Sequence, residues 1–303
     1  MLLTAGLDSA TGLNTAVWRI VGFALWRSTG LAGPAGDPVG VRMSGTGQMA
    51  SPPTGGDAWR LDDRIALVTG ASAGLGARFA RVLHRAGAHV LATAHRADLL
   101  DELARECGER IEVMPGDITD TAHRQALARR LNAHGRLDVL VNNAGICDDG
   151  PIEQQSLDEL RQVVEVNLIS VLDICRLAAP LLSAAPAASV INVASMYGVV
   201  SSRGPMAGYN ATKGALVNLT RQLAAQWGGH GVRVNALAPG YFPTELTGHL
   251  ADADFARSIH EHTLLARTPA LEEIDGPLLF LATAASSYMT GQVLVIDGGW
   301  TAV

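Results

Sequence analysis

Lysine is nearly absent from this chain of 303 residues: 22 of its 23 basic residues are arginine, and the one lysine is Lys213. A composition rich in alanine, glycine and arginine is typical of a GC-rich genome, in which arginine replaces lysine wherever arginine serves as well. Arginine cannot act as an ammonium group with a tunable pKa. Lys213 is therefore a candidate functional residue before any motif is considered.

Cysteine is also scarce, and the chain has no net positive charge. The three cysteines, Cys107, Cys147 and Cys175, show no clustered spacing. That spacing excludes a disulfide framework and a cysteine-rich zinc site, and it favours a reducing, cytoplasmic compartment. The 23 basic residues against 29 acidic ones give a formal net charge of −6. The chain thus lacks the basic stripe of a nucleic-acid-binding protein.

The first 60 residues differ in composition from the rest, because glycine and proline make up a quarter of them. Their one apolar stretch, Leu13–Trp26, has helical spacing but is too short to span a membrane, contains Arg19 and lacks the basic start of a signal peptide. Three interpretations stay open: a disordered tail, an amphipathic helix that contacts a membrane or a partner, or an upstream start codon with Met43 or Met49 as the true start. We predict residues 1–60 to be a flexible or mis-annotated extension.

From residue 61 onward, short apolar runs alternate with helical patterns, without a break in composition. This alternation predicts one domain over residues 61–303, of the α/β class, with a doubly wound parallel sheet of seven strands and helices on both faces. The predicted strands are Ile65–Thr69, Ala88–Ala94, Ile111–Met114, Leu137–Val141, Val190–Val193, Val232–Leu237 and Val293–Ile296. The predicted helices are Leu75–Ala86, Ala97–Cys107, Thr121–His134, Leu157–Leu182, Tyr209–Trp227 and Leu271–Ala284.

A glycine-rich loop, residues 69–76, lies between the first strand and the first helix. In that context it predicts a dinucleotide site, in which Gly70 permits the turn, Gly74 lets backbone amides approach a diphosphate, and Gly76 lets helix and strand pack closely. The alternative is an ordinary tight strand–helix turn.

The second strand ends in Ala94, at a position where an NAD-binding site usually has an acidic residue for the ribose hydroxyls. Without that acid a 2′-phosphate is not repelled, and His95 and Arg96 can meet it. The sequence therefore favours NADP(H), with NAD(H) as the alternative cofactor. Arg96 as a solvated residue at a helix start is the alternative to a role in binding.

Two further strands end in polar residues where ligands bind such sheets. Asp117 follows the third strand, where the adenine is expected, with a helix N-cap as the alternative. The run Asn142-Asn143-Ala144-Gly145 ends the fourth strand, where amide side chains can bridge backbone strands and small residues leave room for a cofactor. As a turn signal alone this run would be unremarkable.

Four residues form a candidate catalytic set. Tyr209 and Lys213 are four apart at the start of a helix, so they share a face, and both the ammonium group and the helix N-terminus are expected to lower the pKa of the phenol. Ser195, at the end of the fifth strand, can donate to the same substrate oxygen, and Asn167 can hold a water that links Lys213 to solvent. Each of these residues taken alone has a purely structural alternative.

With these motifs in place, residues 61–303 resemble the short-chain dehydrogenase/reductase family. The resemblance rests on the loop Thr69–Gly76, the Asn-Asn-Ala-Gly run, the set Asn167, Ser195, Tyr209 and Lys213, the turn Pro239-Gly240 with Thr244, and Asp297-Gly298-Gly299. It implies a Rossmann-type fold, and a homotetramer or homodimer with helices 157–182 and 209–227 between subunits. Two features depart from the pattern: the 60-residue extension, and Ala73 where many NADP-dependent relatives carry arginine.

The resemblance also implies which residues contact the cofactor, with Lys213 at the nicotinamide ribose and Thr244 at the carboxamide. The expected cofactor-binding residues are Gly70, Ser72, Gly74, Leu75, Gly76, His95, Arg96, Asp117, Ile118, Asn143, Ala144, Gly145, Tyr209, Lys213, Pro239, Gly240 and Thr244. The expected activity is NAD(P)(H)-dependent interconversion of a secondary alcohol and a ketone.

The expected substrate is a neutral, largely apolar small molecule, because the segments 146–152, 196–207 and 241–262 supply mainly apolar side chains with only Arg203 and Arg257 as single cations. No nucleic acid, membrane span or metal is expected. The alternatives are a 3-oxoacyl-thioester reductase, a catalytically silent cofactor-binding sensor or scaffold, and a metal hydrolase suggested only by His249, His260 and His262.

Overall fold

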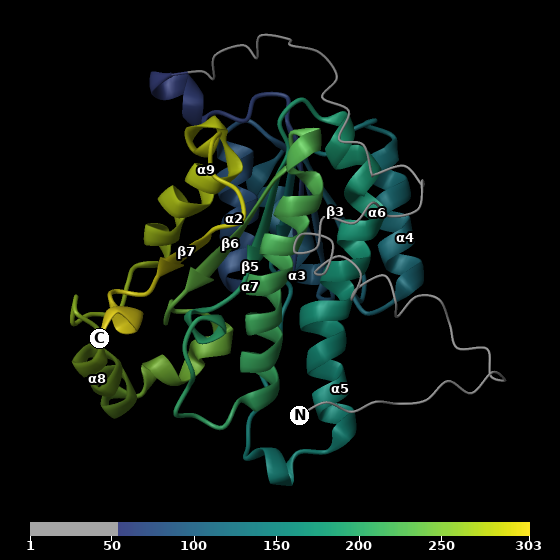
Figure 1. Cartoon of the computed structure of the whole chain (residues 1–303). Helices are drawn as coiled ribbons and strands as arrows, with labels where there is room; N and C mark the ends of the chain where they lie inside the picture. The colour runs from purple at the N-terminus through teal and green to yellow at the C-terminus, as the bar shows by residue number, and fades with distance from the viewer. Residues whose placement is uncertain (1–53) are drawn as a thin grey trace, which may run out of the picture. The chain divides into compact units, whose positions relative to one another are not determined.

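The computed structural model describes residues 54–303, and the side chains of His249 and Ala251 are not described. The expectations for Leu13–Trp26, Met43 and Met49 lie outside the described residues. Within the described part, strands and helices alternate along the whole chain, as Figure 1 shows.

The centre of the domain is a parallel sheet of seven strands in the order β3-β2-β1-β4-β5-β6-β7, which confirms the predicted fold class. The strands are β1 (Ile65–Thr69), β2 (His89–Ala94), β3 (Ile111–Pro115), β4 (Val139–Asn142), β5 (Ser189–Val193), β6 (Arg233–Pro239) and β7 (Val293–Ile296). The direction of winding reverses at β1, which pairs with β2 on one side and with β4 on the other. A reversal of this kind opens a crevice at the carboxyl ends of the strands, where ligands bind such sheets.

Helices cover both faces of the sheet, and this is why its strands are apolar on both sides. One face carries α2 (Gly74–Arg85), α3 (Ala97–Cys107) and α9 (Asp275–Ala282); the other carries α4 (Thr121–Asn132), α6 (Ser170–Ala184) and α7 (Ala207–Trp227). Two apolar clusters fill the layers between helices and sheet. Phe79 and Leu100 belong to the first cluster, and Leu127 and Leu216 to the second.

The predicted helix 157–182 is not continuous. It consists of α5 (Leu157–Val164), a π-helical turn η3 (Glu165–Ile169) and α6. Such a turn inserts one extra residue into a helix and is frequent at functional sites. Here it contains Asn167. The whole span Leu157–Ala184 is long and apolar enough to cross a membrane, but 44% of its most apolar part is buried in the domain, so we interpret it as a core helix.

Other predicted boundaries also move where tertiary contacts decide them. The predicted strand at Leu137 starts instead at Val139, because the amide of Leu137 bonds to the carbonyl of Leu181 in α6 rather than to a strand. The predicted helix Leu271–Ala284 starts as the 3-10 turn η7 (Leu271–Ile274), which turns into α9.

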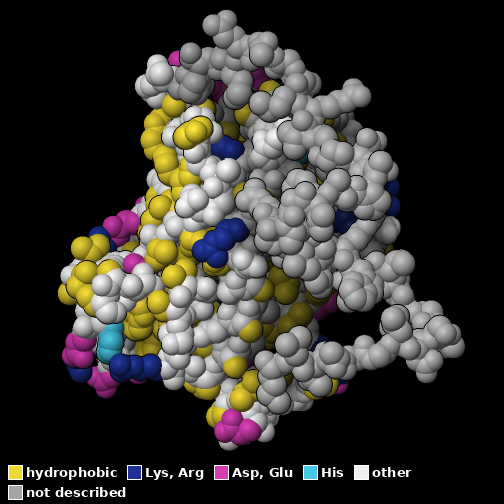
Figure 2. All heavy atoms as spheres, in the orientation of Figure 1, with side chains coloured by type: hydrophobic (Ala, Val, Ile, Leu, Met, Phe, Trp, Pro, Cys, Tyr) yellow, Lys and Arg dark blue, Asp and Glu magenta, His cyan; other side chains and the backbone are white. Residues whose placement is uncertain are grey.

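The segment 241–262, which we call the rim segment, follows β6 and contains the 3-10 region η6 (Glu245–Ala251) and α8 (Ala253–His262). It lies at the same end of the domain as the carboxyl ends of the strands. Figure 2 shows charged side chains of both signs, with a histidine among them, gathered where α8 lies at the lower left. Most described residues of this segment are exposed or half-buried.

Candidate active site

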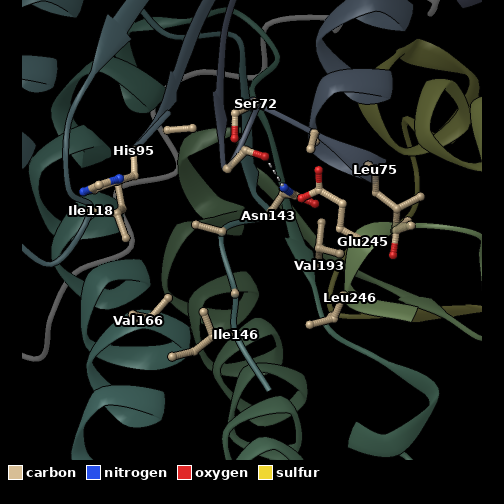
Figure 3. A pocket seen from close by; sticks show the side chains of 18 of the residues that line it. Ser72, Leu75, His95, Ile118, Asn143, Ile146, Val166, Val193, Glu245 and Leu246 are labelled. Atoms are coloured by element: carbon tan, nitrogen blue, oxygen red, sulfur yellow. Dashed lines mark hydrogen bonds between the residues drawn. The ribbon is translucent and has the colours of Figure 1, made fainter. Parts of the chain in front are cut away.

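The carboxyl ends of β1 to β6 border one cleft of about 590 Å³, a size typical of cofactor and ligand sites. Each residue expected to contact a cofactor from Gly70 to Thr244 lines this cleft, and so does Ser195. Figure 3 shows His95 and Ile118 on one side of the cleft and Glu245 and Leu246 on the other. The fold therefore brings together residues that lie far apart in the sequence.

The glycine loop has no room for side chains. A Cβ atom on Gly76 would lie 2.1 Å from the carbonyl oxygen of Gly70, and one on Gly70 would lie 2.8 Å from the amide nitrogen Nδ2 of Asn143. Gly70 and Gly74 also have positive φ angles of +67° and +53°. The loop thus turns directly into α2 with exposed backbone amides at its N-terminus, and such an N-terminus suits a diphosphate.

The loop after β4 is fastened to the glycine loop. Nδ2 of Asn143 donates to the carbonyl oxygens of Thr69 (2.8 Å) and Gly70 (3.2 Å), and the Thr69 hydroxyl accepts from the backbone amides of Asn143 and Ala144 (both 3.0 Å). The expected bridging by an amide side chain is thus present. Asn142 instead points into the core and donates to Asn192 (2.9 Å).

Asp117 lines the cleft but does not cap a helix. Its Oδ1 accepts from the backbone amide and the hydroxyl of Thr119, both at 2.8 Å, and these bonds hold the pKa of the carboxyl below its usual range. The cap of α4 is Asp120, whose Oδ1 accepts from the amide of Ala122 at 2.8 Å. The capping alternative for Asp117 is therefore wrong, and Asp117 has a carboxylate oxygen left for the cleft.

Arg96 is neither free nor simply solvated. Its guanidinium forms a two-pronged ion pair with Glu245 of the rim segment, with Nη2–Oε2 at 2.8 Å and Nη1–Oε1 at 3.1 Å. The hydroxyl of Ser72 lies 3.4 Å from both Nε and Nη2 of Arg96. No sequence pattern points to this pair, since 149 residues separate the two partners.

Lys213 is buried in α7, and its Nζ donates to the carbonyl oxygen of Val193 at 2.8 Å. The Nζ lies 5.5 Å from the centre of the Tyr209 ring. Burial lowers the pKa of Lys213 to about 8. Among the described residues, no carboxylate forms an ion pair with Lys213. The ammonium group is held by the carbonyl of Val193, and it lies next to Gly145, where a Cβ atom would be 3.3 Å from Nζ.

The pKa of Tyr209 differs from the expected direction. Burial raises it to about 12, and a hydrogen bond with Ser195 opposes the shift only in part. The nearby ammonium and the helix N-terminus, on which the sequence prediction rests, both favour the phenolate. Desolvation of the charged form is the larger effect here.

The helix N-terminus near Tyr209 is also occupied by a carboxylate. Asp148, in the loop after β4, is buried, and its two oxygens accept from the backbone amides of Tyr209 (2.6 Å) and Gly208 (2.9 Å). The local cap residue Met206 makes no such bond. Asp148 is thus a cap supplied from a distant loop, and its negative charge offsets the helix dipole that was expected to act on Tyr209.

A third bond holds Asp148 in place, from Nε2 of Gln155 at 3.0 Å. A Cβ atom on Gly208 would lie 3.2 Å from Oδ2 of Asp148, so the glycine leaves space for the carboxylate. Reasoning from the sequence missed Asp148. The signal that was available is the lack of any capping side chain before Gly208 at the start of a long helix.

Asn167 lies in the π-helical turn, and its side chain bridges two parts of the site. Its Nδ2 donates to the carbonyl of Ile146 (2.8 Å) and to the hydroxyl of Thr212 (3.1 Å), and its Oδ1 accepts from the amide of Ile146 (2.8 Å). These bonds fix the loop after β4 against α7. Both amide protons are used, so a relay water could contact this side chain only through the second lone pair of Oδ1, and the relay stays a prediction.

The segments 196–207 and 241–262, which were expected to border the substrate, meet in an aromatic group whose contacts the sequence did not reveal. The hydroxyl of Tyr197, two residues after Ser195, lies 2.9 Å from the hydroxyl of Tyr241. The ring of Tyr241 packs edge-on against Phe255 and Trp300. Within the segments expected to supply apolar side chains, Met196 and Phe242 are buried and Val199 is exposed.

Two of the three histidines of the hydrolase alternative make structural contacts, and the side chain of the third, His249, is not described. His260 bonds to the hydroxyl of Thr268 (3.0 Å), and His262 bonds to the carbonyl of Ser258 (2.7 Å) and packs on Trp300. Within residues 54–303, no three described His, Cys, Asp or Glu side chains are placed to hold a metal ion. The metal-hydrolase alternative therefore has no support in the geometry.

Comparison with known proteins agrees with the site. A family model described as enoyl-(acyl carrier protein) reductase matches residues 70–301. Galactitol 2-dehydrogenase (L-tagatose-forming) of Cereibacter sphaeroides is 37% identical over 246 residues, 80% of this chain and 97% of that protein. Cis-4-hydroxycyclohexanecarboxylate dehydrogenase of Sinomonas cyclohexanicum is 37% identical over 245 residues, 80% of this chain and 98% of that protein.

Among solved structures, a gluconate 5-dehydrogenase from Burkholderia cenocepacia J2315 in complex with NADP and tartrate matches with a TM-score of 0.77 and 35% sequence identity. The match covers 82% of this chain and 98% of that chain. The chain belongs to the short-chain dehydrogenase/reductase family, and it is an oxidoreductase that acts on CH–OH groups.

Proposed function

We propose that this chain interconverts a neutral secondary alcohol and its ketone with NADP(H) as the favoured cofactor, and that Tyr209 carries the proton. The observation that supports this most is the position of Tyr209, Ser195 and Lys213 on the same cleft as the glycine loop. One wall of the cleft therefore suits a dinucleotide, while another presents the hydroxyl groups of Tyr209 and Ser195 to a substrate oxygen.

The residues of the cleft fit a nicotinamide dinucleotide. The backbone amides at the N-terminus of α2 can take a diphosphate, and the close approach of Gly70 and Gly76 leaves space that any side chain would fill. Asp117 and Ile118 border the adenine side, and Lys213 the ribose side. When bound, the nicotinamide supplies or accepts the hydride.

Three side chains divide the work at the substrate oxygen. Ser195 donates to the oxygen and stabilises negative charge there, and Tyr209 gives or takes the proton. Lys213 is cationic below a pH of about 8 and holds positive charge under the Tyr209 ring. Asp148 and Asn167 do not line the cleft. They fix the start of α7 and the loop after β4, so that Tyr209 faces the cleft.

The preference for NADP(H) rests on Ala94 and on the charge of Arg96, with His95 beside it. A small buried alanine at the end of β2 presents no carboxylate to a 2′-phosphate, and the guanidinium of Arg96 lies at the cleft. Ala73 provides no second arginine, so the preference depends on a single strong cation.

The substrate class follows from the walls of the site. Ile146, Phe242 and Leu246 line the cleft with apolar side chains. The hydroxyls of Tyr197 and Tyr241, which bond to each other at 2.9 Å, are a polar pair close to Ser195 and Phe242 in the sequence. Arg257 is already paired with Asp254 at 2.8 Å. A medium-sized or cyclic alcohol without a negative charge therefore fits best, and a 3-oxoacyl thioester is the alternative.

We also propose that the protein is a homotetramer or homodimer in the cytoplasm. Large apolar side chains are exposed along α5, η3 and α6 at Leu157, Val164, Ile169 and Leu172. An apolar stripe of this kind on one helix suits a second copy of the same helix.

A panel of alcohols and ketones tests the proposal directly. NADPH oxidation is followed by its absorbance with cyclohexanone derivatives, with L-tagatose and with acetoacetyl coenzyme A, and the reverse reaction with the matching alcohols and NADP⁺. We expect turnover with neutral cyclic or polyhydroxylated ketones and its loss in Tyr209→Phe. Activity with acetoacetyl coenzyme A alone would favour the thioester alternative, and activity that persists in Tyr209→Phe would contradict the assigned role of Tyr209.

A further inference from the structure

The ion pair between Arg96 and Glu245 lies where two distant parts of the chain meet at the cleft. Arg96 precedes α3 at the end of β2, and Glu245 belongs to the rim segment after β6. Both residues line the cleft together with Ser72, whose hydroxyl is 3.4 Å from two nitrogens of Arg96. In Figure 3 Glu245 lies on the side of the cleft opposite His95.

The ion pair occupies the terminal nitrogens of Arg96, which are the groups that would bind a phosphate. Each oxygen of Glu245 accepts from one terminal nitrogen of Arg96, Oε2 from Nη2 at 2.8 Å and Oε1 from Nη1 at 3.1 Å. This two-pronged arrangement is the one that a guanidinium also offers to a phosphate. A phosphate group that approaches Arg96 must therefore displace Glu245 or approach a guanidinium whose charge is already matched.

A cofactor without the 2′-phosphate can bind without displacing Glu245 from Arg96. A ribose 2′-hydroxyl is neutral and can donate to a carboxylate, which is the role that an acid at the end of the second strand plays in NAD-binding sites. Ala94 cannot play that role, but Glu245 brings a carboxylate to the neighbouring Arg96 from elsewhere in the chain.

We propose that Glu245 is a determinant of cofactor specificity, which competes with a 2′-phosphate for Arg96 and so limits the preference for NADPH over NADH. This inference rests on the proposed function for the identity of the cofactor. Glu245 follows Thr244, an expected cofactor contact, by one position, and it belongs to none of the motifs found in the sequence.

The size of the effect follows from exposure. The side chains of Arg96 and Glu245 are 43% and 65% exposed, so water and salt screen the pair, and exposed pairs contribute little to stability. We therefore expect a change in affinity of roughly three- to tenfold and no measurable loss of folding when the pair is broken.

Binding titrations test the proposal without any substrate. The dissociation constants of NADPH and NADH are measured by cofactor fluorescence, and those of 2′,5′-ADP and 5′-AMP by calorimetry, for the wild type, Glu245→Gln, Arg96→Gln and the double variant. We expect Glu245→Gln to bind NADPH and 2′,5′-ADP about three- to tenfold more tightly, with NADH and 5′-AMP changed less than about twofold or weakened. In the Arg96→Gln background most of this gain should disappear.

Glu273→Gln is the matched control. Glu273 forms a similar two-pronged and exposed ion pair with Arg267, at 2.6 and 2.7 Å, and neither residue lines the cleft. This variant removes one negative charge from the protein and one ion pair from its surface, and its cofactor affinities should stay at the wild-type values.

Three outcomes would overturn the proposal. Unchanged NADPH affinity in Glu245→Gln would mean that the pair and the phosphate do not compete. An equal gain for NADPH and NADH would mean that Glu245 only holds the rim segment over the cleft. A full gain in the Arg96→Gln background would show repulsion that does not involve Arg96. Binding of both cofactors without turnover of any ketone would contradict the proposed function. The comparison of dissociation constants would still decide the role of Glu245, because it needs no substrate.

Discussion

Charged side chains are buried at one end of the cleft and exposed at the other. Around Tyr209 the charged groups are buried: Lys213 is 4% exposed and Asp148 is 7% exposed. Around Arg96 they are open to water. Burial lowers the pKa of Lys213 and raises that of Tyr209, so both groups are pushed toward their neutral forms. At the exposed end the ion pair raises the pKa of Arg96 and lowers that of Glu245, so both stay charged.

This contrast indicates a division of roles. The shifted pKa of Lys213, about 8, lets this group exchange protons near neutral pH, whereas the raised pKa of Tyr209 keeps its phenol protonated there. Both groups depend on their buried positions, which tolerate little change. An exposed pair contributes only modest energy and can be exchanged during evolution with little effect on folding. Substitutions at the buried end should therefore have large effects, and those at the exposed end or in the first residues small ones.

The largest effect is expected for Lys213→Arg. Arginine keeps the positive charge but is bulkier and has a pKa too high to pass a proton on. A Cβ atom on Gly145 would already lie 3.3 Å from Nζ of Lys213, so the site has little space for a guanidinium. We expect kcat/KM with the best ketone of the panel to fall at least about 100-fold in a protein that stays folded by circular dichroism.

Chemical modification gives an independent check on Lys213. The only other amine is the N-terminus, so an amine-reactive reagent should inactivate the wild type, and NADPH should protect it. Near-normal turnover of Lys213→Arg would remove the reason to assign this lysine any role that arginine lacks.

The next largest effect is expected for Asp148→Ala, which removes the cap of α7 from the amides of Gly208 and Tyr209. We expect kcat to fall about tenfold with KM and NADPH affinity nearly unchanged, and the free energy of unfolding to fall by about 1–2 kcal/mol. Asp148→Asn keeps an oxygen acceptor and should restore most of the kcat.

Asp120→Ala is the control for this prediction, because Asp120 caps α4 away from the cleft. It should lower stability by about 1 kcal/mol and leave kcat at the wild-type value. If Asp148→Ala behaved in the same way as Asp120→Ala, the cap would serve folding alone.

A third prediction concerns the cost of a buried lysine. The pKa of Lys213 is about 8 in the folded protein, against an ordinary value of 10.5 that applies to the unfolded chain. At Lys213 the unfolded chain therefore binds more protons between these values, so the penalty that this residue imposes on stability should shrink as the pH increases from 8 to 10.5. Lys213→Met should be more stable than the wild type at neutral pH, by roughly 2 kcal/mol.

Chemical unfolding at about pH 7 and at about pH 10, at one protein concentration, measures this difference. The advantage of Lys213→Met should shrink at the higher pH, because the wild type then loses its buried charge. A constant difference at both pH values would show that the ammonium is not destabilised by burial.

The smallest effect is expected for removal of the residues that precede Asp57. A protein that starts at Asp57 keeps Ala58, which is buried, and Trp59, whose ring centre lies 6.3 Å from that of Phe280. We expect unchanged unfolding temperature, oligomeric state by light scattering, and turnover. Aggregation or loss of activity in this protein would show that the extension is structural.

The sequence alone determined the class of fold and most of the residues of the cleft. Short apolar runs between helical patterns can be stable only as a sheet covered on both faces, and every strand end of a parallel sheet faces the same edge. Gly70, Asp117, Asn143 and Ser195 each follow a strand, so their meeting at that edge could be predicted without coordinates. Lys213 was marked by composition, because one lysine among 22 arginines requires a reason.

Only the tertiary structure decided what these residues contact. Asp148 reaches the start of α7 across 60 positions of sequence, and Glu245 reaches Arg96 across 149. Neither follows from local propensity or periodicity, because such contacts depend on how loops after different strands come together. The direction of the Tyr209 pKa was mistaken for the same reason: burial is a property of the assembled domain, and desolvation there outweighs the neighbouring charge that the sequence does show.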